Sequence, residues 1–174
     1  FLDNSLQVNG SAYFYDYDTI HTFTQQACPP GGSIEGANSA CAVTDNTASV
    51  QAAPGAEMYG LELEVLWLAT DTLTLGGNYS YTHSEYSEDF FIIDGADPTI
   101  PSAIYTEADN ADRARNVKGN QLLQVPEQKL SVYAQYTYSM GDAGSVDLLA
   151  SWSWIDDVYF SAFESALDEA PAYD

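Results

Sequence analysis

The amino-acid sequence predicts an all-β chain that forms part of a transmembrane antiparallel β-barrel. Three observations support this fold class. Five segments of nine or ten residues alternate apolar and polar side chains, which is the period of a β-strand. One face of every segment carries no charge, and the connections alternate between short and long. We therefore expect about five long strands in sequence order, joined by short periplasmic turns and long outer loops.

The predicted strands repeat one pattern along the chain. Residues 6–15 set Leu, Val, Ala and Phe against Gln, Asn and Ser, and residues 59–67 set Leu, Val, Tyr and Trp against two Glu. Residues 73–82, 129–138 and 146–155 follow, with Tyr or Trp toward the ends of their apolar faces. Nine or ten residues suit a tilted strand that crosses a bilayer, whereas strands of soluble proteins average about 5–6.

The two faces of these strands predict opposite surroundings. An Arg or Lys at mid-membrane on a lipid face costs about 2–4 kcal/mol, so an uncharged face suits lipid. The predicted aromatic girdle consists of Tyr59, Trp67, Tyr79, Tyr81, Tyr136, Tyr138, Trp152 and Trp154. The predicted lumen-facing side chains include Glu62, Glu64, Asn78 and Lys129. A soluble β-sandwich also alternates apolar and polar residues, so strand length and the girdle decide for the barrel.

The connections predict the orientation of the strands. Residues 69–72 and 139–145 are short hairpin turns, whereas roughly forty residues separate the first strand from the second and the third from the fourth. Outer-membrane barrels have short periplasmic turns and long outer loops, so the first strand rises to the outside. Pro126 would break a ladder in mid-strand, so we place it above the membrane band. Residues 90–93 are apolar; they either contact a ligand or, as we expect, pack the loop on itself.

The charge balance excludes several partners. The 174 residues carry 26 Asp and Glu against 4 Lys and Arg, a formal net charge of −22. Nucleic-acid binding needs a basic patch, and so does a surface helix on anionic lipid. No run of 18 apolar residues is present, so no transmembrane helix is expected.

Candidate sites for chemistry have simpler structural interpretations. Glu62 and Glu64 could act as paired carboxylates, but in a wide lumen such groups contact water, Lys129 or a plug. His21 and His83 could share a metal, yet two isolated histidines fit the barrel rim better. The second long loop has acids that could bind Ca²⁺, although their spacing fits no EF-hand: Asp94, Asp97, Glu107, Asp109 and Asp112. We expect no enzyme, no metal site and no cofactor.

Cys28 and Cys41 are the two cysteines of the chain and lie in a stretch rich in Gly, Pro, Ser and Asn. Two thiols with no nearby His make a poor zinc site, because zinc wants four close ligands. We therefore predict a loop-closing disulfide and an oxidising compartment. Two unrelated free thiols are the alternative.

Four stretches of the chain occur in an order that points to one family. They are Phe14-Tyr15-Asp16-Tyr17, Ala56-Glu57-x-x-Gly60-x-Glu62-x-Glu64, Asn78-x-Ser80-Tyr81-Thr82-x-Ser84-x-Tyr86 and Gly119-Asn120-x-Leu122-x-x-Val125-Pro126-x-x-Lys129-x-Ser131. In these stretches the sequence resembles TonB-dependent outer-membrane receptors. The resemblance covers nearly all the chain in order, apart from the two long loops.

The resemblance implies a 22-stranded barrel with an N-terminal plug. It also implies import of a scarce nutrient, such as a ferric siderophore, cobalamin or a carbohydrate, powered through a plug that contacts an inner-membrane energising complex. The expected partners are outer-membrane lipid, the receptor's own plug domain, that complex and a small-molecule nutrient. This chain shows no plug and too few strands to close, so we expect residues 1–174 to be an internal piece of the C-terminal half of the barrel.

Two other functions remain open at this point. A passive, porin-like outer-membrane barrel would share the strand pattern but would have no plug. A secreted β-sandwich that binds carbohydrate through exposed Tyr and Trp would stay in buffer, whereas a barrel needs detergent.

Overall fold

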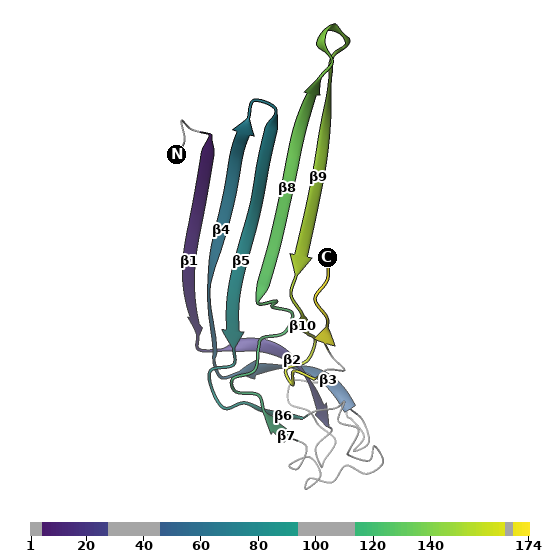
Figure 1. Cartoon of the computed structure of the whole chain (residues 1–174). Helices are drawn as coiled ribbons and strands as arrows, with labels where there is room; N and C mark the ends of the chain where they lie inside the picture. Colours follow the sequence, from purple (N-terminus) through teal and green to yellow (C-terminus); the bar gives the residue numbers. More distant parts are fainter. Residues whose placement is uncertain (1–4, 28–45, 94–113, 166–168) are drawn as a thin grey trace.

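A five-stranded antiparallel sheet dominates the computed structural model, which describes residues 5–27, 46–93, 114–165 and 169–174. The sheet order is β1-β4-β5-β8-β9, with the short turns at one end and the long connections at the other (Figure 1). Its strands are β1 (Leu6–Tyr17), β4 (Ala56–Thr70), β5 (Leu73–Glu85), β8 (Gln128–Ser139) and β9 (Ser145–Ile155). All five predicted strands and their sequential pairing are confirmed. The sheet is open within this chain.

The register places the two predicted faces on opposite sides of the sheet. Residues directly opposite each other in antiparallel strands point to the same side. One continuous row across the five strands is Gly10, Leu63, Tyr79, Leu130 and Trp154. The adjacent row, on the other side, is Asn9, Glu64, Asn78, Ser131 and Ser153. The alternation predicted from sequence therefore holds across all five strands in these rows, and the β4–β5 register shifts only near the turn, between Leu68 and Thr70.

The strands extend beyond the predicted segments, most of all where the long connections begin. β4 has 15 residues and β5 has 13. The added residues include Asp16, Glu57 and Glu85, which lie directly opposite one another on β1, β4 and β5. Alternation of apolar and polar residues stops at these acids, so the sequence pattern could not detect the last paired residues of these strands.

Each short turn is held by local interactions. In the β4–β5 turn, Thr70 Oγ1 accepts the backbone N–H groups of Thr72 at 3.2 Å and Leu73 at 3.0 Å. The β8–β9 turn contains the 3₁₀ helix η1 (Gly141–Ala143). Gly141 and Gly144 have φ values of 63° and 108°, a region that favours glycine.

The long connections contain a second sheet that the sequence analysis assigned to loops. It has the order β3-β2-β6-β7. Its strands are β2 (Ile20–Ala27), β3 (Asn46–Ala53), β6 (Phe91–Ile93) and β7 (Ala114–Asn116). Gln25 of β2 pairs with Ile93 of β6, so the two long connections are joined in one sheet. A small hairpin of β10 (Val158–Tyr159) and β11 (Glu169–Ala170) lies near the C-terminus.

The buried core of the described residues lies at this outer end, where it includes Ala56 at the start of β4, and does not extend along the long sheet. Its members are Ala53, Ala56, Tyr86, Phe90, Ile92, Val117, Leu122 and Ala162. Packing of the 90–93 stretch on the loop is confirmed for Phe90 and Ile92, whereas Phe91 is 61% exposed. Pro126 precedes β8, outside the ladder, as predicted.

Some predictions concern residues that the structure does not describe. Cys28, Cys41 and the loop acids from Asp94 to Asp112 lie outside the described ranges. The disulfide and the question of calcium binding therefore stay predictions. Among the described residues, no helix is long and apolar enough to cross a membrane.

Candidate functional site

The polar face of the long sheet contains a hollow in which two carboxylates accept hydrogen bonds from the neighbouring strand. Asn9 Nδ2 donates to Glu64 Oε2 at 3.0 Å, and Ser11 Oγ donates to Glu62 Oε2 at 3.2 Å. These bonds tie β1 to β4 and orient both carboxylates. Lys129 of β8 lines the same hollow and is separated from Glu62 by the Ser80 position of β5. The four residues predicted to share this face, Glu62, Glu64, Asn78 and Lys129, line one hollow.

A tyrosine ladder continues the polar face toward the long connections. Tyr13, Tyr15 and Tyr17 alternate along β1, with ring centroids 5.5 Å apart for the first pair and 6.0 Å for the second. Tyr15 is 50% exposed and Tyr17 is 38% exposed. This ladder was not predicted from the sequence, although the spacing i, i+2, i+4 on the parity of the polar face was a sufficient signal.

The first rung of the ladder depends on a glycine. Tyr13 Oη lies 2.7 Å from Thr82 Oγ1, two strands away, so its ring crosses β4. The residue of β4 that it crosses is Gly60, whose added Cβ would lie 2.6 Å from Tyr13 Oη. A bare backbone at this position therefore allows the tyrosine to link three strands.

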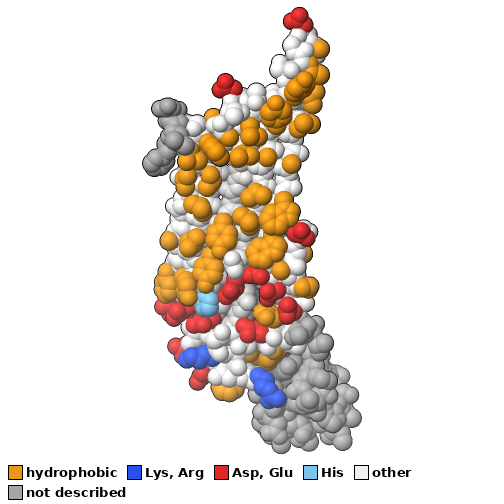
Figure 2. Space-filling view, in the orientation of Figure 1, with side chains coloured by type: hydrophobic (Ala, Val, Ile, Leu, Met, Phe, Trp, Pro, Cys, Tyr) orange, Lys and Arg blue, Asp and Glu red, His pale blue; other side chains and the backbone are white. Residues whose placement is uncertain are grey.

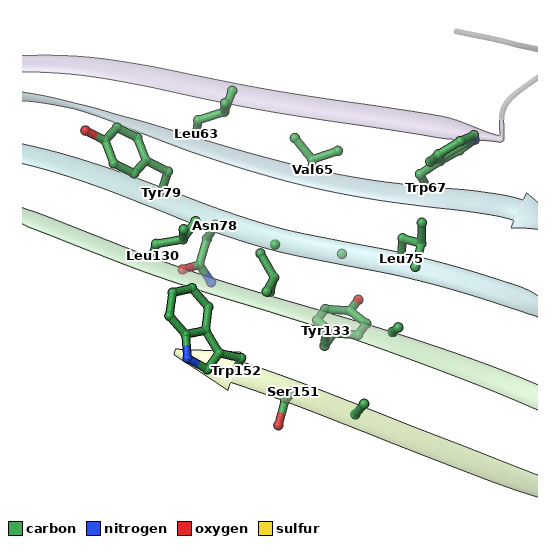
Figure 3. A pocket seen from close by; sticks show the side chains of 15 residues that line it. Leu63, Val65, Trp67, Leu75, Asn78, Tyr79, Leu130, Tyr133, Ser151 and Trp152 are labelled. Atoms are coloured by element: carbon green, nitrogen blue, oxygen red, sulfur yellow. The ribbon is translucent and has the colours of Figure 1, made fainter. Parts of the chain in front are cut away.

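The opposite face is apolar along most of the sheet, up to the outer end where Asp16, Glu57 and Glu85 share its parity. Figure 2 shows hydrophobic side chains over the sheet, while acidic side chains gather toward the end with the long connections. A hollow of about 640 Å³ opens on this face. Leu63, Val65, Trp67, Tyr79 and Trp152 surround it (Figure 3). All eight predicted girdle residues lie on this side by register.

An acidic rim surrounds His83 at the outer end of β5. His83 Nε2 lies 3.5 Å from Glu85 Oε2, and His83 Nδ1 lies 3.5 Å from Glu127 Oε1. The imidazole ring also packs on Tyr59, with centroids 4.8 Å apart. The two acids approach different nitrogens of the ring, so this arrangement suits a rim histidine between two carboxylates rather than a metal ligand.

The predicted rim role for the histidines agrees with their separation. His21 lies on β2 in the second sheet, whereas His83 lies on β5 in the long sheet. Within the described ranges, no group of three or more His, Cys, Asp or Glu side chains is arranged to hold a metal.

Burial changes the pKa of one carboxyl group at the outer end, that of Asp156. Partial burial is the main reason that the pKa of Asp156 lies above its ordinary value of 3.8. The charges of Asp157 and Glu127 raise that pKa further, while the backbone N–H of Asp157, 3.1 Å from Asp156 Oδ1, opposes the shift. These carboxylates contribute to the acidic character of the rim.

A long antiparallel sheet with one apolar face, one polar face and short turns at one end only is the wall of a transmembrane β-barrel. The family described as "TonB dependent receptor-like, beta-barrel" matches residues 1–174. The chain belongs to this family, whose members are outer-membrane proteins that act as transporters. A search of curated proteins found no significant match.

Proposed function

We propose that this chain forms part of the wall of a receptor that imports a scarce nutrient across the outer membrane with energy from the inner membrane. The observation that carries the proposal is the two-sided sheet, with an uncharged row such as Gly10, Leu63, Tyr79, Leu130 and Trp154 on one side. The family membership supports a transporter and not an enzyme. Residues 1–174 then act as one partial barrel domain.

The two faces take different roles in this proposal. The apolar face contacts lipid, and its Tyr and Trp residues form the girdles. The polar face lines the lumen, where Glu62 and Glu64 are held by Ser11 and Asn9. Fixed carboxylates on a lumen wall are suited to meet a plug domain, which in turn contacts the inner-membrane energising complex.

The tyrosine ladder supports a ligand with rings. Tyr15 and Tyr17 present exposed aromatic faces at the outer end of the lumen wall. Aromatic faces stack on planar rings and on apolar ring faces. The nutrient classes that fit are ferric siderophores, cobalamin and carbohydrates.

Uptake by cells tests the proposal. A deletion strain and its complemented parent receive labelled ferric siderophore, cobalamin and oligosaccharide, each with and without a protonophore. We expect the deletion to abolish uptake of one class, and the protonophore to abolish it in the parent. Uptake that survives the protonophore would instead indicate the passive porin.

A matched pair of substitutions tests the ladder within that assay. Tyr15→Ala removes a lumen-face ring, whereas Phe14→Ala removes the adjacent ring on the opposite face. We expect a weaker apparent affinity for the nutrient in Tyr15→Ala only, by about 1–3 kcal/mol if one stacked ring is lost, as for bases stacked on aromatic side chains. Equal effects of the two substitutions would contradict the role of the ladder.

A further inference from the structure

The hollow on the apolar face has a floor of small residues and a border of large ones. Gly77 on β5, Ala134 on β8 and Ala150 on β9 contribute to its lining. They lie in adjacent rows, since Leu75 pairs with Ala134 and Ala134 with Ala150, while Gly77 pairs with Val132. The small side chains of Ala134 and Ala150 are therefore contiguous across two strands. Gly77 on β5 is covered by the Val132 side chain, whose Cγ1 is 3.1 Å from where a Cβ would lie. Two exposed indoles, Trp67 and Trp152, lie on opposite sides of it (Figure 3).

The shape of this hollow suits one flexible hydrocarbon chain. The row of Trp67 and the row of Leu63 are four residues apart, about 13 Å at the usual strand rise. The hollow is open to the outside along the face, and its lining from Leu63 to Trp152 is mainly apolar, although it includes Asn78, Tyr133 and Ser151. A flat lipid-facing wall makes only brief contacts with acyl chains. A recess with a floor of small residues increases the apolar area that one acyl chain buries.

We propose that this recess holds one acyl chain of a zwitterionic glycerophospholipid from the periplasmic leaflet. The inference rests on the assignment of this face to lipid made above. The chain belongs to a family of outer-membrane barrels, and the recess lies on the face assigned to lipid, so the occupant is expected to be a lipid. The distribution of charge then decides from which leaflet the chain enters.

The two ends of the recess differ in charge. On the Trp152 side, its indole N–H donates to the carboxylate of Asp174 at 3.3 Å, and Asp156, Asp157 and Glu127 follow at the end of β9 and the start of β8. Such carboxylates repel the phosphates of lipid A. At the other end of the sheet, the two short turns have one acid each, Asp71 and Asp142, which is fewer than at the Trp152 side. The acyl chain is therefore expected to enter the recess past Trp67 and to reach as far as Tyr79 and Trp152.

Native mass spectrometry of the full receptor, extracted from outer membranes in a mild detergent, tests the inference. We expect the parent protein to retain one phospholipid. Ala134→Phe and Ala150→Phe fill the recess from two strands and should each lower that occupancy at least about tenfold, because loss of two buried methylenes already corresponds to that factor. Ala12→Phe, on the same face of β1 but outside the recess, is the control and should retain the lipid.

The outcomes separate this inference from the proposed function. Equal phospholipid occupancy in all four proteins, retention of lipid A, or a bound second copy of the receptor would each overturn the inference. If the proteins assemble in the outer membrane and take up nutrient but retain no lipid, the inference alone fails. If Ala12→Phe, Ala134→Phe and Ala150→Phe all prevent assembly, the assignment of the face to lipid fails and the inference fails with it.

Discussion

One buried hydrogen bond holds the outer connections against the end of the long sheet. Thr22 Oγ1 lies 3.0 Å from Tyr86 Oη, and the two residues are 6% and 1% exposed. Burial raises the pKa of Tyr86 above its ordinary value of 10.0, against an opposite effect of the bond to Thr22. The phenol therefore stays protonated at physiological pH and remains available as a partner.

Removal of both partners of this bond should cost less stability than the two single removals added together. Tyr86→Phe or Thr22→Val leaves a buried hydroxyl without its partner, which costs about 1–3 kcal/mol of local stability. The double variant should lose less than the sum of the single losses. Hydrogen exchange at the Gly119 amide, which donates to the Tyr86 carbonyl at 2.8 Å, measures local opening. Strictly additive losses would show that the two hydroxyls do not depend on each other.

A second residue-scale prediction separates the two faces by parity alone. In the full receptor, Leu63→Arg should impair assembly more than Glu64→Arg, because Arg at mid-membrane on the lipid face costs about 2–4 kcal/mol. Trp154→Arg, near the outer end, should cost only about 0–1 kcal/mol. Heat-modifiable gel mobility of outer-membrane fractions reports assembly.

The third substitution in this set distinguishes a barrel from a soluble sandwich. In a sandwich core even truncation of an aromatic residue costs about 3–5 kcal/mol. Equal losses for Leu63→Arg, Glu64→Arg and Trp154→Arg, or a loss for Glu64→Arg alone, would contradict the assignment of the faces.

At the scale of elements, the Tyr13 crossing makes β1, β4 and β5 depend on one glycine. Gly60→Ala would place a methyl group 2.6 Å from Tyr13 Oη and closer still to the backbone carbonyl oxygen of Tyr81, so both the Tyr13 ring and the β4–β5 pairing must shift. We expect a loss of roughly 1–3 kcal/mol, typical of overpacking. Gly10→Ala is the control, since its Cβ would be 3.7 Å from the Glu62 carbonyl oxygen. Thermal unfolding of both variants in detergent should show a lower midpoint for Gly60→Ala only.

The elements also show what the sequence could predict. Period-2 alternation identified β1, β4, β5, β8 and β9 because most of the length of each strand presents one uniform face to each environment. It failed for β2 and β3, whose pattern of Thr, Gln and Ala has no apolar face, and for the three-residue strands β6 and β7. Those strands depend on partners far along the chain, such as Gln25 with Ile93, which local periodicity does not reveal.

The candidate site was predictable to a similar extent. Parity alone placed Glu62, Glu64, Asn78 and Lys129 on one face. The link from Tyr13 to Thr82 needs the register of three strands, because the two residues are 69 positions apart. The recess on the apolar face likewise follows from the alignment of Ala134 and Ala150, which no single strand shows.

At the scale of the whole molecule, the isolated chain should not be a stable monomer in water. The open sheet exposes two strand edges, β1 and β9, and one apolar face. Unpaired edges and exposed apolar faces favour association. Analytical ultracentrifugation of residues 1–174 in buffer should show aggregates that detergent disperses. A sharp, cooperative unfolding transition of a monomer in plain buffer would contradict the membrane assignment.

The central claim is that the sheet separates lipid from an aqueous lumen, and spin labels along β4 test it most directly. Single labels at Glu62, Leu63, Glu64 and Val65 of the full receptor in lipid bilayers are measured with oxygen, which concentrates in lipid, and with a water-soluble nickel complex. We expect the labels at Leu63 and Val65 to respond to oxygen, and the labels at Glu62 and Glu64 to respond to the nickel complex where the plug leaves them accessible. Nickel access at Leu63 and Val65, or oxygen access that does not alternate along the strand, would contradict the claim.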